Sequence, residues 1–548
     1  MFPTVIRPRL PRRLRVLVPT SAALLGGLML GACGADTRET GEWDTLIVGG
    51  TVVDGTGAPG FRADVAITGS RIVRVSTVGL HPDGAERVVD ATDMVVAPGF
   101  VDLHTHLNTI DDHPGARSHV SQGVTTALGG PDGGGPFPFG EYMAELEEMG
   151  VGMNVGYLTG HNTIRRTVMG LENRAPTDAE LERMRGMVAQ AMSEGAWGIS
   201  TGLKYLPGAF SDVDEVVALS EPAAEAGGIY TSHLREEGLG LLEGVSEAIE
   251  IGRRADVPVV LTHHKVVGEP MWGSSATTLA MVDSAREAGV DVMIDQYPYT
   301  ASYTGCDILI PTWAQAGGDD ELLARMDDPA LADSILAGIA YNIVTDRGGN
   351  DLSRVQFAIV SWDESLEGET LADLAEREGL DPTPENGADL LIEVVRSGGA
   401  SCIFHAMDQG DVDAIMAHPQ TMIASDGRLT APGIGHPHPR WYGTFPRVLG
   451  RYVRERGVLD LSTAVHKMTA MPARRLGLVD RGEVREGWIA DLVVFDPETV
   501  IDRATFESPH QYPEGIPWVF VNGVAQIVDG AFADLRPGQV LRRPIGGS

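Results

Sequence analysis

Residues 100–106 read FVDLHTH, a short apolar run that ends in two histidines separated by one residue. Alternate side chains of a β-strand project to the same side, so His104 and His106 can face one point at the carboxyl end of this strand. Seven more apolar runs follow along the chain, with helical patterns between them. We expect strands at residues 100–105, 124–128, 153–158, 196–201, 229–232, 257–262, 290–296 and 421–425.

The alternation of strands and helices predicts an α/β fold, a (β/α)8 TIM-like barrel, over residues 98–478. One helical pattern starts after Thr177, which with Glu180 forms a capping-box signature. The gap between the seventh and eighth strands predicts an insertion at about 300–419 that covers one mouth of the barrel. Residues 44–97 and 479–548 read as short strands separated by Gly and Asp-Gly turns, so we expect a small β-sandwich built from both chain ends.

Polar side chains stand where several of the expected strands end. His233 follows the fifth strand, His263 the sixth and Asp426 the eighth. The carboxyl ends of barrel strands meet at one mouth, where barrel enzymes keep their active sites. A single histidine there could equally be a packed core residue. Together with His104 and His106, however, these side chains predict a metal centre, because imidazole and carboxylate are ligands that zinc binds.

The composition limits the class of partner. The chain has 548 residues, a formal net charge of −34, 43% hydrophobic residues and 22% charged residues, which excludes a disordered or fibrous protein. Nucleic acids and anionic membrane surfaces bind proteins mainly through cationic side chains, so we expect neither as a partner of so acidic a chain. Three cysteines are too few to hold a fold of this size together through disulfides.

Five motifs carry a closer resemblance to a known family. They are QGVTT at 122–126, GAWGISTG at 195–202, DQYPY at 295–299, ASDG at 424–427 and HPRWYGTFPR at 438–447. Through them the chain resembles the N-acyl-D-amino-acid deacylases (D-aminoacylases) of the amidohydrolase superfamily, over nearly its whole length from about residue 44. The resemblance implies metal-dependent hydrolysis of a small-molecule substrate, an N-acyl-D-amino acid, to a carboxylate and a D-amino acid.

The resemblance also implies roles for individual residues. His233 and His263 would hold a tightly bound zinc ion, and His104 and His106 would line a second, weaker metal position. Asp426 would be the catalytic acid and base, activating water for attack on the amide. Four residues match family positions that contact the substrate: Lys265, Arg440, Tyr205 and Tyr297. The first two of these would hold the substrate carboxylate.

Three positions depart from the family pattern. The family usually reads Gly-Asn-Cys-Gly after the second strand, with the cysteine on zinc, whereas residues 130–133 here read GPDG. Our hypothesis is that Asp132 replaces the cysteine as a ligand and can bridge two ions, the alternative being that it only shapes a turn. Because carboxylate is harder than thiolate, Mn²⁺ or Co²⁺ would compete better with Zn²⁺. Tyr303 and Asn108 replace a small hydroxyl residue and an acid near the substrate, which leaves the preferred side chain open.

An alternative function is another C–N hydrolase of the same superfamily, one that opens a cyclic amide or cuts a dipeptide with a D-residue. Lys204 lies near the place where hydantoinases and dihydroorotases carry a carbamylated lysine, but it falls beyond the strand end, so we interpret it as a loop residue. A non-catalytic lipid-anchored binding protein is disfavoured, because an aspartate buried beside a metal has no evident structural purpose.

Residues 1–32 have the composition of a bacterial secretory signal. Five arginines and no acid precede an uncharged run that ends LGAC at residues 30–33. This ending resembles a lipobox, in which Cys33 would be lipidated, and residues 33–43 would form a tether. We therefore expect the protein in the cell envelope, anchored by lipid and facing the periplasm, at the outer membrane. The alternative is an ordinary signal peptide with an incidental cysteine.

The lipobox interpretation predicts that Cys33→Ser changes the location of the protein. Without the thiol no acyl chain can be attached, so the variant should leave the detergent-extracted membrane fraction and enter the soluble periplasmic fraction. Cell fractionation followed by immunoblotting measures this distribution. The same distribution for both proteins would contradict the prediction.

Overall fold

The computed structural model describes residues 38–349 and 351–544. The predicted signal segment, Cys33 and the first residues of the predicted tether lie outside the described residues. All eight predicted strand positions of the central body contain strands, three of them as two successive pieces. These strands are β6 (Phe100–Asp102) with β7 (Thr105–His106), β8 (Val124–Gly129), β9 (Asn154–Tyr157) with β10 (Thr159–Gly160), β11 (Gly198–Gly202), β12 (Ile229–His233), β13 (Val259–Leu261), β14 (Val292–Gln296), and β18 (Thr421–Ile423) with β19 (Gly427–Arg428).

These strands pair in parallel and in chain order. Hydrogen bonds join them in the orders β6-β8-β9, β10-β11-β12-β13-β14-β18 and β19-β7. The last pair brings the end of the eighth strand position back to the first, with Gly427 opposite Thr105 and Arg428 opposite His106. Among the described residues the pairing runs through three separate sheets, so the central body is an α/β arrangement of barrel type without one continuous closed sheet.

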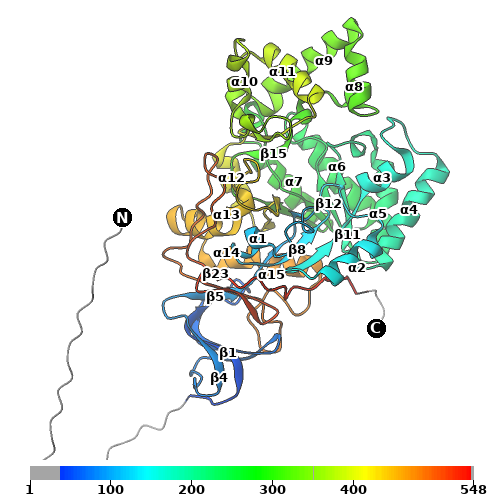
Figure 1. Cartoon of the computed structure of the whole chain (residues 1–548). Coiled ribbons are helices and arrows are strands. Elements are labelled where there is room, and N and C mark those ends of the chain that lie inside the picture. The colour runs from blue at the N-terminus through cyan, green and yellow to red at the C-terminus, as the bar shows by residue number, and fades with distance from the viewer. Residues whose placement is uncertain (1–37, 350, 545–548) are drawn as a thin grey trace, which may run out of the picture.

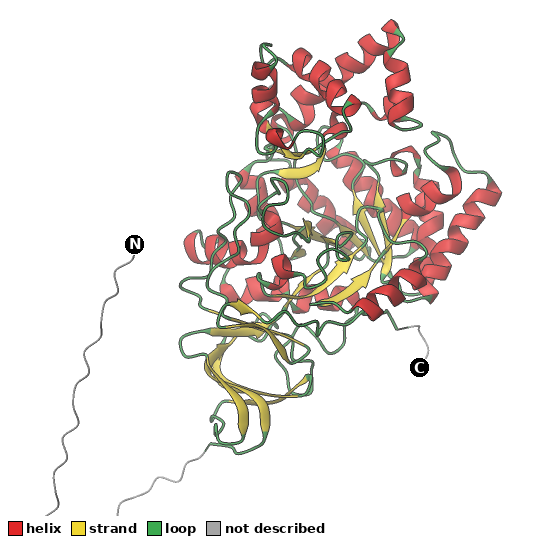
Figure 2. Ribbon diagram, in the orientation of Figure 1, coloured by secondary structure: helices red, strands yellow, loops and turns green. Residues whose placement is uncertain are grey.

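Helices pack around these strands, as Figures 1 and 2 show. The helices of the central body are α1 (Arg117–Val120), α2 (Phe139–Met149), α3 (His161–Met169), α4 (Asp178–Ser193), α5 (Val213–Glu225), α6 (Leu241–Ala255), α7 (Ser275–Glu287), α12 (Gln409–Ala417), α13 (Arg440–Arg447), α14 (Leu461–Met468) and α15 (Ala470–Leu476). The capping box predicted for α4 is confirmed, because Thr177 and Glu180 exchange both hydrogen bonds. No helix in the described part of the chain is long and apolar enough to cross a membrane.

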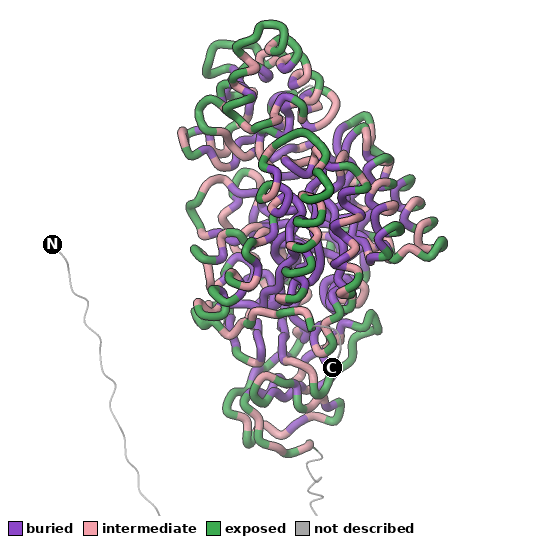
Figure 3. Tube along the Cα trace, turned by 90° about the vertical axis from the view of Figure 1, so that its right-hand side faces the viewer, coloured by how far each residue is buried: buried purple, intermediate pink, exposed green. Residues whose placement is uncertain are grey.

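The core of the central body follows from simple periodicities. All residues of β11, β12 and β13 are buried, as expected for parallel strands covered on both faces. Helix α6 buries Leu241, Val245, Ala248 and Ile251, whose spacing of three and four residues places them on one face. Figure 3 shows that the buried residues concentrate in the middle of the molecule.

Both chain ends contribute to a second sheet. Its nine strands are β1 (Trp43–Val52), β2 (Phe61–Thr68), β3 (Arg71–Ser76), β4 (Ala85–Asp90), β5 (Val95–Pro98), β20 (Leu492–Phe495), β21 (Trp518–Val521), β22 (Val524–Val528) and β23 (Ala531–Phe532). The two ends meet where β5 pairs antiparallel with β20. The structure thus joins both predicted segments in one sheet, and the two-layer packing of a sandwich stays a prediction. Residues 538–541 belong to the segment predicted for the sandwich but pack on the central body instead. There Val155 of β9 exchanges backbone hydrogen bonds with Gln539 and Leu541.

The long segment between β14 and β18 forms a unit with its own core, at the top of Figure 1. It contains the sheet β15-β17-β16 (Ser302–Gly305, Ser401–Phe404, Val355–Ile359) and the helices α8 (Asp319–Met326), α9 (Pro329–Asn342), α10 (Leu371–Arg377) and α11 (Pro384–Arg396). Helix α12 lies within the predicted span of 300–419 but packs against α7 and β18 of the central body. A disulfide joins Cys306 to Cys402 across this insertion, a pairing that the sequence analysis did not predict.

The disulfide predicts a stability effect confined to the insertion. It closes a loop with a sequence separation of 96 residues, and such cross-links typically stabilise by about 2–4 kcal/mol. The double variant Cys306→Ala/Cys402→Ala should therefore exchange amide hydrogens of β15 and β17 faster, with β11–β13 unchanged, in hydrogen-exchange mass spectrometry. Wild-type protein in reductant is the matched control and should behave in the same way. Equal exchange of oxidised wild type and double variant would contradict the prediction.

Candidate metal centre

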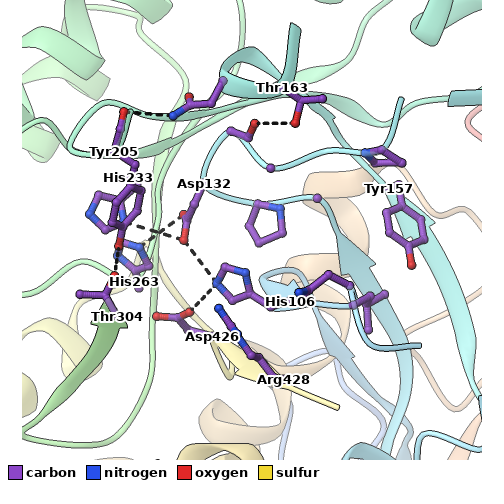
Figure 4. Close-up of a pocket in the computed structure, with 18 of the residues that line it drawn as sticks. His106, Asp132, Tyr157, Thr163, Tyr205, His233, His263, Thr304, Asp426 and Arg428 are labelled. Atoms are coloured by element: carbon purple, nitrogen blue, oxygen red, sulfur yellow. Dashed lines mark hydrogen bonds and ion pairs between the residues drawn. The ribbon is translucent and has the colours of Figure 1, made fainter. Parts of the chain in front are cut away.

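The strand ends bring all five predicted metal ligands and Asp426 to one place. Figure 4 shows four of these ligands, His106, Asp132, His233 and His263, with Asp426. Two groups of residues have the spacing of metal ligands, each with its candidate ligand atoms within 4.8 Å of one another. The first group is His104, His106, Asp132 and Asp426, and the second is Asp132, His233 and His263. The two groups share Asp132. The arrangement therefore offers two neighbouring cation positions with one carboxylate common to both.

Asp132 lies between the histidines because of the loop that follows β8. Its backbone has a φ of 53°, a left-handed conformation that aspartate tolerates better than most residues. Ser200 of β11 fixes this loop, since its hydroxyl donates to the carbonyl of Gly130 and accepts from the amide of Gly133. The predicted position of Asp132 beside the imidazoles is therefore what the structure has.

Distances around the Asp132 carboxylate match a bridging position. Its Oδ2 atom lies 3.6 Å from Nε2 of His104, 3.4 Å from Nε2 of His106 and 3.8 Å from Nδ1 of His233. The other oxygen, Oδ1, lies 3.4 Å from Nε2 of His263. One carboxylate thus faces four imidazoles from three strand ends and the strand piece β7.

The polar atoms that point into this centre lack partners. Both ring nitrogens of His104 and of His233, Nε2 of His263 and Oδ1 of Asp132 are buried without a hydrogen bond among the described residues. Buried polar groups are normally satisfied, because each one left unpaired costs about 1–3 kcal/mol. Imidazole nitrogen and carboxylate oxygen are donors that Zn²⁺ and similar divalent ions accept. The donor set and its unsatisfied atoms therefore fit a bound metal.

Charge in the centre favours ionised carboxylates. Burial opposes the charge on Asp132, but His104 and His263 attract it and hold its pKa well below the ordinary value. Burial also opposes the charge on Asp426, and there Arg440 and the hydrogen bond with His106 lower the pKa. Asp426 is thus an anion that can accept a proton.

A layer of hydrogen bonds holds the reactive side chains in place. Asp102 accepts from the backbone amide and the hydroxyl of Ser425, so it fixes the residue before Asp426. The amide of Asp426 donates to the carbonyl of His104 at 2.9 Å. Asp295 accepts from the backbone amide of His263 at 2.6 Å. Asp426 and His263 both have positive φ values, of 47° and 37°, and these bonds hold that unfavourable backbone.

The two cations predicted to bind the substrate carboxylate have carboxylate partners within the chain. Lys265 Nζ lies 2.5 Å from Oε1 of Glu237 and 2.6 Å from Nδ1 of His263. Arg440 pairs with Asp426 at 3.0 Å and lies over the ring of Tyr297, 4.5 Å from its centroid. Lys265 lines the pocket over the metal centre, whereas Arg440 is not among the lining residues.

Sequence reasoning missed two buried charged residues beside the centre. Glu237 lies 3.3 Å from Nδ1 of His263 and pairs with Lys265, and Arg347 of the insertion pairs with it at 3.1 Å. Burial opposes the charge on Glu237, but Lys265 and then His233 lower its pKa well below the ordinary value. The signal for Glu237 was its position four residues after His233. Arg347 carried no such signal, because it is remote from every motif.

The pocket above the metal centre has a volume of about 710 Å³ and contains both predicted tyrosines. The ring of Tyr205 lies 4.5 Å from that of His233, and its hydroxyl accepts from Thr304. Tyr303 and Asn108 also line the pocket. Lys204 does not line this pocket. Its Nζ atom pairs with Glu236 at 2.8 Å, and Lys204 belongs to neither ligand group. This placement agrees with the interpretation of Lys204 as a loop residue.

Comparisons with known proteins agree over nearly the whole chain. The amidohydrolase family model matches residues 87–528. A D-aminoacylase of Alcaligenes xylosoxydans xylosoxydans is 36% identical, with 91% of this chain and 98% of that protein covered. An N-acyl-D-glutamate deacylase of the same organism is 38% identical, with coverages of 91% and 96%.

A solved structure gives the same result. The N-acyl-D-glutamate deacylase of Bordetella bronchiseptica, crystallised with zinc and a phosphonate inhibitor, is 37% identical, with a TM-score of 0.78 and coverages of 92% of this chain and 100% of that one. The central body therefore has the TIM-barrel-like α/β fold of these proteins. Together the sequence and structure comparisons place this chain in the N-acyl-D-amino-acid deacylase (D-aminoacylase) family of the amidohydrolase superfamily.

Proposed function

We propose that this protein hydrolyses the amide bond of N-acyl-D-amino acids in a metal-dependent reaction, giving a carboxylate and a D-amino acid. The observation that carries the proposal is the pair of ligand groups that share Asp132, the first of which includes Asp426 in the pocket. Relatives 36–38% identical over 91% of the chain are named as deacylases of N-acyl-D-amino acids. The D-configuration in the proposal comes from these relatives alone.

The metal would be held by His233, His263 and Asp132, with His104 and His106 at the second position. A bound divalent ion supplies Lewis acidity to the amide carbonyl and lowers the pKa of a water molecule. We propose zinc, on the donor set and on the zinc in the similar crystal structure. The carboxylate of Asp132 in place of a thiolate supports competition from Mn²⁺ or Co²⁺.

Asp426 is the proposed acid and base. Its carboxylate lies 3.1 Å from Nε2 of His106, within the first ligand group, where it can take the proton of the attacking water and return it to the leaving nitrogen. Arg440 keeps this carboxylate charged and fixes its orientation through the ion pair. In this role Arg440 is a positioning residue, since Asp426 already occupies its guanidinium.

The substrate's α-carboxylate would meet Lys265 in the pocket. Lys265 is 3% exposed and lies 5.7 Å from the centroid of the Tyr297 ring, so the two form one corner of the site. Tyr205, on the neighbouring strand end, has its hydroxyl free to donate, because it accepts the hydrogen bond of Thr304. These three groups would orient the amino-acid half of the substrate.

The remaining architectural and cellular predictions belong to the same proposal. The eight strand positions would close into a barrel, and the sheet of both chain ends would fold into a sandwich. Lipidation at Cys33 and a place in the periplasm receive support from the Cys306–Cys402 disulfide, since such bonds persist mainly in oxidising compartments.

The cyclic-amide alternative would need a carbamylated Lys204, and the pairing of Lys204 with Glu236 does not support it.

The reaction can be tested with pairs of N-acetyl-D- and N-acetyl-L-amino acids. The zinc-loaded protein should release amine from the D-isomers, and Asp426→Asn should lower kcat by about 10²–10⁴-fold because the acid and base is lost. A dihydropyrimidine is the control substrate for the alternative function. Ring opening without deacylation would move the protein to that alternative, and equal rates for both isomers would contradict the proposed specificity.

The bridging role of Asp132 predicts an effect on metal content. Asp132→Ala removes a ligand from both groups, so metal retained after dialysis, measured by elemental mass spectrometry, should fall for both positions. Asp132→Cys is the matched control, because it restores the ligand usual in the family and should retain zinc in preference to Mn²⁺. Circular dichroism would verify that both variants are folded. Wild-type metal content in Asp132→Ala would refute the ligand role.

A further inference from the structure

The pocket has two differently charged ends. At one end Tyr142 and Tyr157 pack edge to face, and Asp111 and Glu145 are close enough to raise the pKa of Tyr142 after burial. This end combines aromatic surface with negative charge, so it does not suit an anion. Arg428 lines a different part of the pocket, where β19 brings it close to Asp426 and His106 (Figure 4).

Arg428 is held on an aromatic platform. Its guanidinium carbon lies 5.3 Å from the ring centroid of Tyr303 and 6.0 Å from that of Trp441. The platform is itself fixed, because the Tyr303 hydroxyl donates to Ser401 of the insertion at 2.9 Å. A guanidinium stacked in this way is pre-organised, and less rotamer entropy is lost when it binds a ligand.

Arg428 differs from the three buried cations of the site, Lys265, Arg347 and Arg440, in having no anionic partner. Lys265 and Arg347 pair with Glu237, and Arg440 pairs with Asp426. No ion pair or side-chain hydrogen bond joins Arg428 to another described residue, and its Nε atom is buried without a hydrogen bond. A partly buried guanidinium that faces a pocket, has no ion pair and has its Nε unsatisfied is a site for a carboxylate, which it can bind through two parallel hydrogen bonds.

The position of Arg428 selects one part of the substrate. Asp426 must reach the leaving nitrogen, so the amino-acid half of the substrate lies at this end of the pocket. The α-carboxylate is assigned to Lys265, which leaves the side chain to meet Arg428. Two substitutions agree with an anion here: Asn108 removes an acid that the family resemblance would place in the pocket, and Tyr303 supplies the platform.

We infer that Arg428 binds a carboxylate on the side chain of the substrate, which makes N-acyl derivatives of D-aspartate or D-glutamate the preferred substrate class. The inference rests on the proposed deacylase function and adds the chemistry of the side chain. Arg428 is partly buried and lies near the rings of Trp441 and Tyr303, so the ion pair would be stronger than at an open surface.

The inference is tested by comparing acidic and neutral substrates. Zinc-loaded wild type should have a higher kcat/KM for N-acetyl-D-aspartate or N-acetyl-D-glutamate than for N-acetyl-D-leucine. Arg428→Met should lower the acidic value by about 30-fold or more and change the neutral value by less than about threefold. Arg428→Lys should recover part of the acidic activity, because it keeps the charge without the paired donors.

Arg166→Met is the matched control. Arg166 lines the same pocket but is exposed and donates to the carbonyl of Leu206, so its loss should leave the ratio of acidic to neutral activity unchanged. Equal losses on acidic and neutral substrates in Arg428→Met would assign Arg428 to the α-carboxylate and overturn the inference. A wild-type preference for neutral substrates would overturn it as well.

Binding separates this inference from the proposed function. Binding can be measured without catalysis in the Asp426→Asn variant. Calorimetry on this variant should show tighter binding of N-acetyl-D-glutamate than of N-acetyl-D-leucine. Adding Arg428→Met should abolish the difference. If this difference is found while the wild type cleaves none of the substrates, the carboxylate site stands and the deacylase proposal fails. If the two ligands bind equally, the inference about Arg428 fails, whether or not deacylation is observed.

Discussion

The Asp132 carboxylate is the constraint on which the site depends. It is 8% exposed and faces four imidazoles from three segments of the chain, so it can be tolerated as an anion only while those segments stay together. Two unpaired nitrogens on each of His104 and His233 add to the same cost. A divalent cation would satisfy the Asp132 carboxylate and one ring nitrogen of each histidine. Metal binding would therefore stabilise the packing of the strand ends.

The rest of the architecture serves to hold this arrangement. Asp132, His263 and Asp426 all have positive φ values, and each such residue costs about 1–3 kcal/mol. The backbone amide of His263 donates to the Asp295 carboxylate, and that of Asp426 donates to the His104 carbonyl. Together with the bonds that Ser425 donates to Asp102, they fix His263 and Asp426. The surrounding body of fully buried strands is rigid enough to bear that cost. Strain of this kind is expected where a backbone must aim a reactive side chain.

Sequence predicted the parts of the molecule that depend on local pattern. Strand ends carry their polar residues within two or three positions of an apolar run, so His104, His233 and Asp426 were visible without a structure. Asp132 was visible only against the family pattern, since nothing in a glycine-rich turn distinguishes a ligand from a spacer. Glu237 and Arg347 were missed because their role depends on contact with each other, and they are 110 residues apart in the sequence. The pairing of Arg440 with Asp426 was missed for a related reason: a cation's partner is set by side-chain geometry, which motif spacing does not encode.

The insertion reaches the buried Glu237 carboxylate through Arg347, and this contact has a consequence for how the protein can diversify. Arg347 stands at the end of η5 (Ile343–Arg347), 2% exposed, against the oxygen of Glu237 that Lys265 leaves free. An insertion between two strands can ordinarily be replaced by another sequence, because connecting segments tolerate insertions and deletions far better than core elements do. Here an exchange would remove one of the two cations that pair with the buried Glu237 carboxylate and leave only Lys265. Among homologous chains, the insertion and the residue at position 237 should therefore change together or not at all.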